Sequence, residues 1–520
     1  MNRRPALLAA TILCAVCVAV AGAAPPYVWI KEVATGDAGR VMVLPPRGGE
    51  IGPEAVEAVL AAMAPEERGF NLQYYQRFGR LNVRLTDEIR SLLESVIDRG
   101  QAEVKPVRPV RFLDHPYLVR PQNADSADTS NLDELYPDGV TGYDLTGAGM
   151  LLGVWDEGSV RETHLDLRGR VANRDSAGIF EHSTLVAGTA IGSGAGNAGA
   201  RGMAYEARLW AFSMQFDAIE MLNHGAHLAA SNHSYGMAMG WYQNEACPDK
   251  PMWIGGEGNF EDPLFGKYGI VASDIDGIVR DTDIVSVWSA GNERADMGAA
   301  PGEEHYHYPS CIAIHTDSHA REGVVEYDTV GGASLAKNVI AVGAVASITD
   351  DPILTGDVVP LGPSSFGPTD DGRIKPDLVA AGEDLASTSS AGDDAYAIYV
   401  GTSSSAPTVT GGVALVAQKY RQETGGADPS AAEMKALLIH TAAEAGNDTG
   451  PDYRMGFGLF DARAAADLLG QDGAQPDSAK LVRVDVTDGG SVRVLQTAES
   501  VASGTPLRVT LVWTDPEAPP

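Results

Sequence analysis

The feature that most constrains the fold of this chain is a set of short apolar runs that lack regular polar alternation. They occupy residues 150–155, 209–212, 284–288 and 339–342, and helix-like stretches separate them. A strand buried on both faces has this pattern, because neither side of it meets water. The runs therefore predict an α/β domain in three layers, with a mainly parallel central sheet flanked by helices.

Two helices are expected in the second half of this domain. One begins near Ser403 and extends to about residue 420. The other begins at Asp428-Pro429, where a capping residue precedes proline at the first helical position, and extends to about residue 443. The 59 glycines and the low aromatic content of 7 % favour tightly packed α/β layers over a small barrel.

Residues 1–24 have the pattern of a signal peptide. Arg3 and Arg4 precede an apolar run at residues 6–20, and small residues follow at 21–24. The run is too short to span a bilayer comfortably, and no other segment is long and apolar enough. We therefore expect this segment to be removed and the protein to be secreted, to the extracellular space, the periplasm or the cell surface.

The rest of the chain divides into three regions. Residues 25–120 are expected to form a small α+β unit, with a helix at 87–99 and a strand-like stretch at 104–121. The main domain is expected to cover residues 121–472. Its first residues, 122–129, are small and polar, which predicts an exposed linker that is open to cleavage.

Residues 473–520 change to an alternating pattern that is typical of antiparallel strands. The expected strands lie at 481–486, 491–495 and 507–513, with glycine-rich turns between them. Three strands do not easily bury a sandwich core. The region is therefore predicted to be the start of a C-terminal β-domain that is truncated here, and a small β-extension of the main domain is the alternative.

The charge balance limits the partners of this chain. It carries 70 acidic and 38 basic residues, a formal net charge of −32. Such a surface repels nucleic acid and anionic membranes. A solvated acidic surface is the simplest interpretation, and carboxylates that bind structural Ca²⁺ are another.

Cys247 and Cys311 are the cysteines that remain once the leader is removed. In an oxidising compartment they can pair, and two buried free thiols are the alternative.

Three short strings carry residues suited to nucleophilic catalysis. Asp156 follows an apolar strand, at the carboxyl end where α/β sheets form their active-site crevice. His182 opens a helix in which Ala187 and Gly188 permit close packing. Ser403 follows a glycine turn at a helix N-terminus, where unpaired backbone N–H groups favour an anion. An oxyanion that forms beside a nucleophilic hydroxyl would be stabilised there.

Asn292 ends another apolar strand in the string Ala-Gly-Asn. A side-chain amide at that edge can donate to a developing oxyanion. Taken alone, each of these residues also fits a structural role as a cap or turn residue.

Taken together, the strings resemble those of the subtilisin-like serine peptidases, the subtilases. The chain order Asp, His, Ser is the subtilisin order. Asp156 matches the Asp-x-Gly motif, His182 matches His-Gly-Thr-x-x-Ala-Gly, Ser403 matches Gly-Thr-Ser-x-x-Ala-Pro, and Asn292 matches the oxyanion asparagine. The resemblance covers residues 140–470, and residues 507–516 resemble the start of the β-sandwich of larger bacterial subtilases.

The resemblance implies a secreted endopeptidase that acts on proteins or peptides through an acyl-enzyme. Ser234, Tyr235 and Gly236 resemble the substrate-binding strand, and residues 25–120 correspond to a propeptide that assists folding and inhibits the enzyme. A permanent N-terminal domain is the alternative. No cofactor is required for this chemistry and no metal ligands are expected, although structural Ca²⁺ is common in the family.

The sequence departs from the family pattern at two positions. Ser183 stands where glycine is usual; the first turn of a helix tolerates serine well, and crowding of His182 is the alternative. Glu157 follows Asp156 where a small residue is common, and if Glu157 and His182 come close, its charge is expected to raise the pKa of His182.

A second class of function is a non-catalytic binding module that retains these residues by descent. Reaction of Ser403 with a fluorophosphonate would distinguish the two. A metallopeptidase is disfavoured, because His305 and His307 are two residues apart and the chain has no His-Glu-x-x-His string.

Overall fold

The computed structural model describes residues 122–242, 249–256, 258–296, 298–308, 310–319, 327–348, 353–474, 481–482 and 508–518. In the first 120 residues it describes four strands and residues 57, 60–63 and 68. The chain divides into two compact units, residues 1–120 and 121–520. The expected signal peptide and the helix predicted at 87–99 lie outside the described residues.

A seven-stranded sheet forms the centre of the second unit, in the order β15-β14-β11-β8-β5-β7-β6. All its strand pairs are parallel. The strands are β5 (Leu151–Asp156), β6 (Val171–Asn173), β7 (Arg208–Ser213), β8 (Ala230–His233), β11 (Ser286–Ser289), β14 (Ile340–Val345) and β15 (Leu378–Ala381). Each of the four apolar runs overlaps one of these strands, so the predicted parallel α/β sheet is confirmed.

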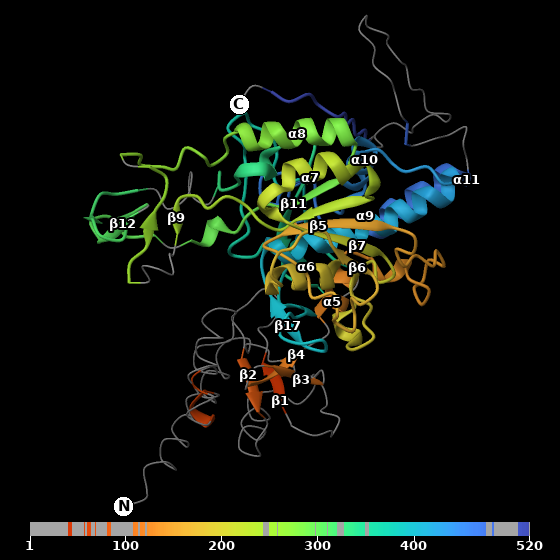
Figure 1. Cartoon of the computed structure of the whole chain (residues 1–520), viewed down its shortest axis with the longest axis horizontal. Coiled ribbons are helices and arrows are strands. Elements are labelled where there is room, and N and C mark those ends of the chain that lie inside the picture. The colour runs from red at the N-terminus through yellow and green to blue at the C-terminus, as the bar shows by residue number, and fades with distance from the viewer. Residues whose placement is uncertain are drawn as a thin grey trace, which may run out of the picture. The chain divides into compact units, whose positions relative to one another are not determined.

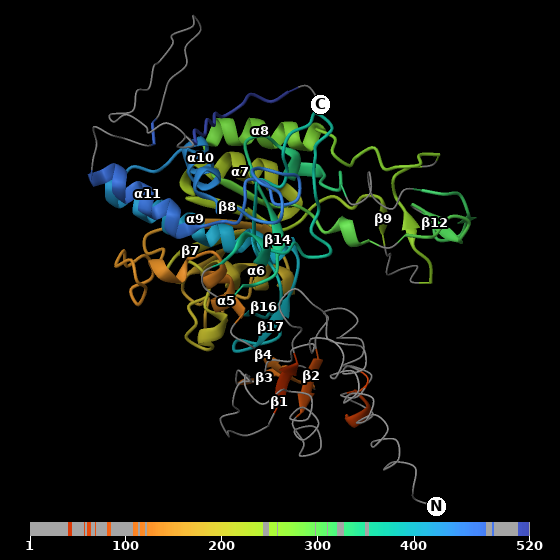
Figure 2. The ribbon, with the colours of Figure 1, turned by 180° about the vertical axis from the view of Figure 1, so that it is seen from behind.

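Helices cover both faces of this sheet and complete three layers (Figures 1 and 2). One face packs against α6 (Glu181–Ile191) and α9 (Thr402–Thr424), together with α10 (Ala431–Thr441) and α11 (Ala462–Ala474). The other face packs against α8 (Ile270–Thr282) and α7 (Asp217–His224). Successive residues of β5 divide between the two cores, Val154 on one side and Trp155 on the other, because side chains alternate across a strand.

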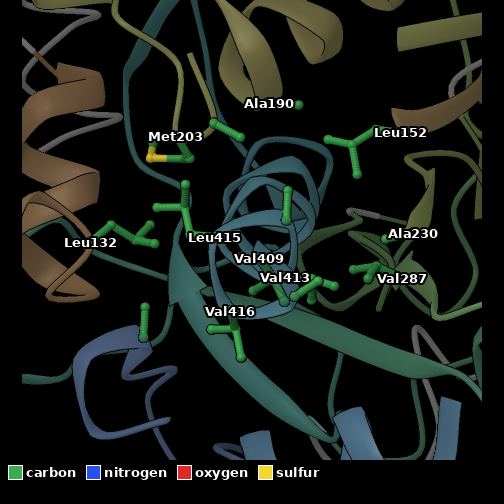
Figure 3. Packing of buried hydrophobic residues seen from close by; sticks show 14 of the residues in the cluster. Leu132, Leu152, Ala190, Met203, Ala230, Val287, Val409, Val413, Leu415 and Val416 are labelled. Atoms are coloured by element: carbon green, nitrogen blue, oxygen red, sulfur yellow. The ribbon is translucent and has the colours of Figure 1, made fainter. Parts of the chain in front are cut away.

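Helix α9 runs through the larger core. Figure 3 shows Val409, Val413 and Val416 of this helix among side chains of the sheet, including Val287. The helix ends at Gly425, which has the left-handed conformation that favours glycine. The next helix, α10, begins later than expected: its cap is Ser430, whose side chain exchanges hydrogen bonds with Glu433.

The expectation of an exposed linker at residues 122–129 was wrong. These residues form helix α5 (Gln122–Thr129), and Asn123, Ser126 and Thr129 are fully buried. The polar groups of these side chains find distant partners, because Ser126 bonds Thr408 and Thr129 donates to the carbonyl of Ile348. Small polar residues therefore mark close packing here, and sequence alone cannot tell this from exposure.

The first unit contains two antiparallel pairs. Strand β1 (Arg40–Val43) pairs with β2 (Leu81–Arg84), and β3 (Arg108–Phe112) pairs with β4 (His115–Val119). The second pair confirms the strand-like character predicted for residues 104–121.

The second unit also contains smaller strand elements outside its three central layers. Strands β16 (Leu385–Thr388) and β17 (Tyr396–Tyr399) form a hairpin. Strands β9 (Trp241–Tyr242), β10 (Met252–Trp253), β12 (His305–His307) and β13 (Ile314–His315) form a separate sheet to one side (Figure 1). Among the described residues, no helix has the length and apolarity needed to cross a membrane.

The prediction of a strand at residues 507–513 was also wrong, as far as the structure describes these residues. Residues 508–518 form no strand. They follow the surface of the main domain, where the backbone of Asp515 exchanges hydrogen bonds with the side chain of Asn338. The strand predicted at 491–495 and most of that at 481–486 lie outside the described residues.

Candidate active site

Asp156 is the last residue of β5 and is fully buried. One carboxylate oxygen, Oδ1, accepts hydrogen bonds from the backbone N–H of Glu157 at 2.8 Å and from the hydroxyl of Ser183 at 3.1 Å. It also lies 2.8 Å from Nδ1 of His182. An aspartate held in this way can fix the orientation of an imidazole ring and stabilise its protonated form.

His182 is the second residue of α6, so the start of that helix positions the ring. Burial lowers the pKa of His182, but the hydrogen bond and the charge of Asp156 outweigh this effect. The charge of Glu157 adds to them, and the pKa is raised above its ordinary value. The influence of Glu157 therefore has the expected direction.

Gly188 permits α6 to approach the hairpin β16–β17. A Cβ atom at Gly188 would lie 2.2 Å from Oγ1 of Thr388. The close packing expected from the small residues of this helix is therefore present.

Ser403 lies in the first turn of α9, directly after Thr402. Its hydroxyl donates to the backbone carbonyl of Ser234 at 3.0 Å. Both Ser403 and His182 belong to the described residues, and no hydrogen bond joins them in this conformation. The structure thus joins Asp156 to His182 directly, and Ser403 to the segment that follows β8.

Asn292 follows β11 at the same edge of the sheet, and its side chain faces the start of α9. Its Oδ1 atom accepts from both the backbone N–H and the hydroxyl of Thr402, at 3.0 and 3.1 Å. This fixes the orientation of the amide and leaves its NH₂ group to donate elsewhere. Gly401 has φ +123°, and a Cβ atom there would lie 2.9 Å from Oδ1 of Asn292. Glycine at this position therefore permits the close approach.

The three predicted substrate-binding residues differ in their surroundings. Ser234 is buried, and its hydroxyl donates to the carbonyl of Ser403 at 3.1 Å. Tyr235 is half-buried, and its hydroxyl donates to Asp217 at 2.7 Å. Gly236 is exposed. The side chains of Ser234 and Tyr235 thus bond within the protein.

Two residues have roles at this site that were not inferred from the sequence, Ser183 and Thr402. Ser183 accepts a hydrogen bond from the N–H of Gly158 and donates to Asp156, so its hydroxyl joins the two segments instead of crowding His182. Thr402 orients Asn292. Its position directly before Ser403 is the signal that points to it.

The cysteine prediction is tested in part. Cys311 is disulfide-bonded, which contradicts a free thiol at this position. Cys247 lies outside the described residues, and its pairing with Cys311 stays a prediction.

The chain matches the model of the subtilase family, peptidase family S8, over residues 147–458. The match contains Asp156, His182, Asn292 and Ser403. Among curated proteins, the serine protease/ABC transporter B family protein tagA of Dictyostelium discoideum is 31 % identical over 189 residues. That alignment covers 30 % of this chain and 10 % of the relative.

C5a peptidase of Streptococcus pyogenes is 35 % identical over 109 residues, 20 % of this chain and 9 % of that protein. The alignments thus span about a tenth of these relatives. Among solved structures, the CspB protease of Clostridium perfringens aligns with a TM-score of 0.49 and 16 % identity, over 66 % of this chain and 97 % of that one. The family match, which covers more than half of the sequence, and the seven-stranded parallel sheet lead to one assignment: this chain is a serine-type peptidase that belongs to the subtilase family.

Proposed function

We propose that this protein is a secreted endopeptidase that cleaves peptide bonds with Asp156, His182 and Ser403 as its catalytic triad. The observation that carries the proposal is the 2.8 Å contact between Asp156 and Nδ1 of His182. It leaves the other ring nitrogen of His182 as the atom that exchanges a proton with a nucleophile. Ser403 supplies that nucleophile after its Oγ rotates away from the carbonyl of Ser234. Catalytic hydrogen bonds often tighten only when substrate is bound.

In the first half of the reaction, Ser403 Oγ attacks the scissile carbonyl carbon while His182 takes the hydroxyl proton. The tetrahedral oxyanion accepts hydrogen bonds from the amide of Asn292 and the backbone N–H of Ser403. His182 then returns the proton to the leaving amine, and the C–N bond breaks to give an acyl-enzyme. In the second half, His182 activates a water molecule that hydrolyses the ester and restores Ser403.

The substrate is proposed to lie extended beside residues Ser234, Tyr235 and Gly236 and to bond their backbone groups, as in strand addition. Gly236, which is exposed and lacks a side chain, permits such an approach. Protein and peptide substrates of many sequences can bind in this way, because the backbone provides the contacts.

The N-terminal regions complete the proposal. Residues 1–24 direct export, and residues 25–120 act as a propeptide that assists folding and occupies the site until it is removed. N-terminal sequencing of the mature enzyme tests both assignments. A start beyond residue 120 supports them, whereas a start at residue 25 would make the second region a permanent domain.

A fluorophosphonate probe tests the catalytic assignment. We expect the probe to label Ser403 in the active chain and to abolish proteolysis. Ser403→Ala should retain the fold, measured by circular dichroism, and lose both labelling and turnover. Ser347→Ala is the matched control, because Ser347 is half-buried and outside the candidate site. Full proteolysis by Ser403→Ala would refute the triad. A folded parent chain, with Ser403 intact, that neither reacts with the probe nor cleaves protein would favour the binding module.

A further inference from the structure

Four side chains with metal-binding atoms converge in the separate sheet β13-β12-β10-β9. His305 and His307 lie on β12, and Asp317 and His319 follow β13. One ligand atom from each of the four lies within 4.8 Å of the others. None of these residues belongs to the candidate active site.

The separations between these atoms match a small coordination sphere. Nε2 of His307 lies 3.2 Å from Nε2 of His305 and 3.0 Å from Nε2 of His319. The carboxylate oxygens of Asp317 lie 3.3, 3.4 and 3.1 Å from Nε2 of His305, His307 and His319. A tetrahedral zinc ion with bonds of about 2.0–2.1 Å places its ligands about 3.3–3.4 Å apart.

The contacts of the Nδ1 atoms, which point away from the cluster, show how the Nε2 atoms at its centre are protonated. Nδ1 of His305 lies 3.0 Å from the carbonyl of Glu303, and Nδ1 of His319 lies 2.6 Å from the carbonyl of Asn259. A carbonyl only accepts, so each Nδ1 carries the proton. In its neutral form each ring then presents a bare Nε2 lone pair to His307, and a single N–H on His307 can satisfy only one of them. A cation at the centre satisfies all of them.

The surroundings hold the rings in place and limit the access of water. His305 and His319 are buried, and Trp253 stacks on His319 with ring centroids 4.3 Å apart. Trp241 meets the edge of His305 at 5.1 Å. His307 is also buried, and its Nδ1 has no hydrogen-bond partner. Burial of such polar rings is costly unless a ligand compensates for it.

We propose that His305, His307, Asp317 and His319 bind one zinc ion that stabilises this sheet. Three imidazole nitrogens exclude Ca²⁺ and Mg²⁺, which take oxygen ligands. Two Nδ1–H groups on backbone carbonyls are the outer contacts typical of zinc-bound histidines. Four protein ligands close the coordination sphere, so the site is structural rather than catalytic. The exposed Asp317 provides the entry side.

The proposed zinc site is connected along the chain to the candidate active site. The sheet is built from the segments that follow β8 and β11, the strands that lead to Ser234 and Asn292. All four ligands lie in the segment after β11, so zinc would join Asp317 and His319 to β12. Strand β12 in turn pairs with β10, which belongs to the segment after β8. The spacing of histidines along the chain is a further sign of the cluster, because four of the 11 lie at residues 305–319.

Metal content of the full chain tests the proposal, in a Ser403→Ala background that prevents autolysis and without a polyhistidine tag. We expect one zinc per chain after dialysis, a lower melting temperature after removal by a chelator, and recovery on adding zinc alone. Cobalt(II) in its place should give the intense visible absorption of a tetrahedral site. These measurements need no change to a ligand residue, and they do not depend on whether the chain is a peptidase.

Substitution of the proposed ligands tests which residues bind the zinc ion. His307→Gln with His319→Gln should abolish zinc binding. His315→Gln should retain it, although its ring stacks on His307 at 3.8 Å, and so should the exposed His227→Gln. A chain that binds no zinc at micromolar free metal would overturn the proposal. Retention of one tetrahedral ion by the double variant would overturn it equally.

Discussion

The hydroxyl of Ser403 donates to the carbonyl of Ser234 at 3.0 Å, and the hydroxyl of Ser234 donates to the carbonyl of Ser403 at 3.1 Å. The second bond has a cause in the sequence. In α9 the carbonyl of Ser403 would accept from the N–H four residues later, but residue 407 is proline and has no N–H. Ser234 supplies the missing donor, and so joins the candidate nucleophile to the proposed substrate-binding segment, residues 234–236.

This relationship predicts non-additive stability changes. Ser234→Ala should destabilise the protein by about 0.5–1.5 kcal/mol, because it removes the hydrogen bond that the carbonyl of the half-buried Ser403 accepts. In a Pro407→Ala background the restored N–H serves that carbonyl, so the cost of Ser234→Ala should fall. The parent, the two single variants and the double variant form a double-mutant cycle, and their free energies of unfolding in urea measure the coupling between Ser234 and Pro407. Ser405→Ala is the control, since its hydroxyl donates to Thr402, and equal costs of Ser234→Ala in both backgrounds would exclude the explanation.

The charge of Glu157 should influence how kcat/KM falls at acid pH. Burial lowers the pKa of His182, Asp156 raises it more, and the charge of Glu157 raises it further. His182 must be neutral to accept a proton, so Glu157→Gln should shift the acid limb of kcat/KM to lower pH. Added salt should reduce the difference from the parent enzyme, because Glu157 is exposed. The exposed Glu162→Gln should leave the profile unchanged, and an upward shift in Glu157→Gln would contradict the assignment.

The charge of Glu293, the residue after Asn292, should influence how kcat changes at alkaline pH. Burial raises the pKa of Glu293 to about 7, and the charge of Asp296 adds to this effect. Above that pH the carboxylate of Glu293, the residue after Asn292, ionises, and its negative charge opposes the charge of the proposed oxyanion. We expect kcat to decline as pH rises through about 7 and Glu293→Gln to abolish this decline. Identical profiles for the two enzymes would show that the Glu293 charge does not reach the oxyanion.

A buried charge network should make Asp377 essential for stability. Asp377 lies 2.7 Å from the Lys375 ammonium and 2.8 Å from that of Lys435, and all three residues are buried. Asp377→Asn leaves two buried cations without a counter-charge, which should cost about 3–5 kcal/mol of unfolding free energy. The control Asp281→Asn breaks an exposed pair with Arg280, which water and salt screen, so its cost should be much smaller. Comparable losses in the two variants, by urea unfolding, would refute this account.

The sequence by itself determined the parallel sheet, because apolar runs such as residues 150–155 encode burial within one strand. It also determined which of its residues are candidates for catalysis, because Asp156, His182 and Ser403 each sit in a short string of neighbours. Only the tertiary structure decided that residues 122–129 form a buried helix, that Ser234 compensates for Pro407, and that four metal-binding side chains meet around one point. Each of these depends on partners between elements that no local pattern connects. Whether a polar side chain is exposed, bonded or a ligand is set by what the fold brings to it.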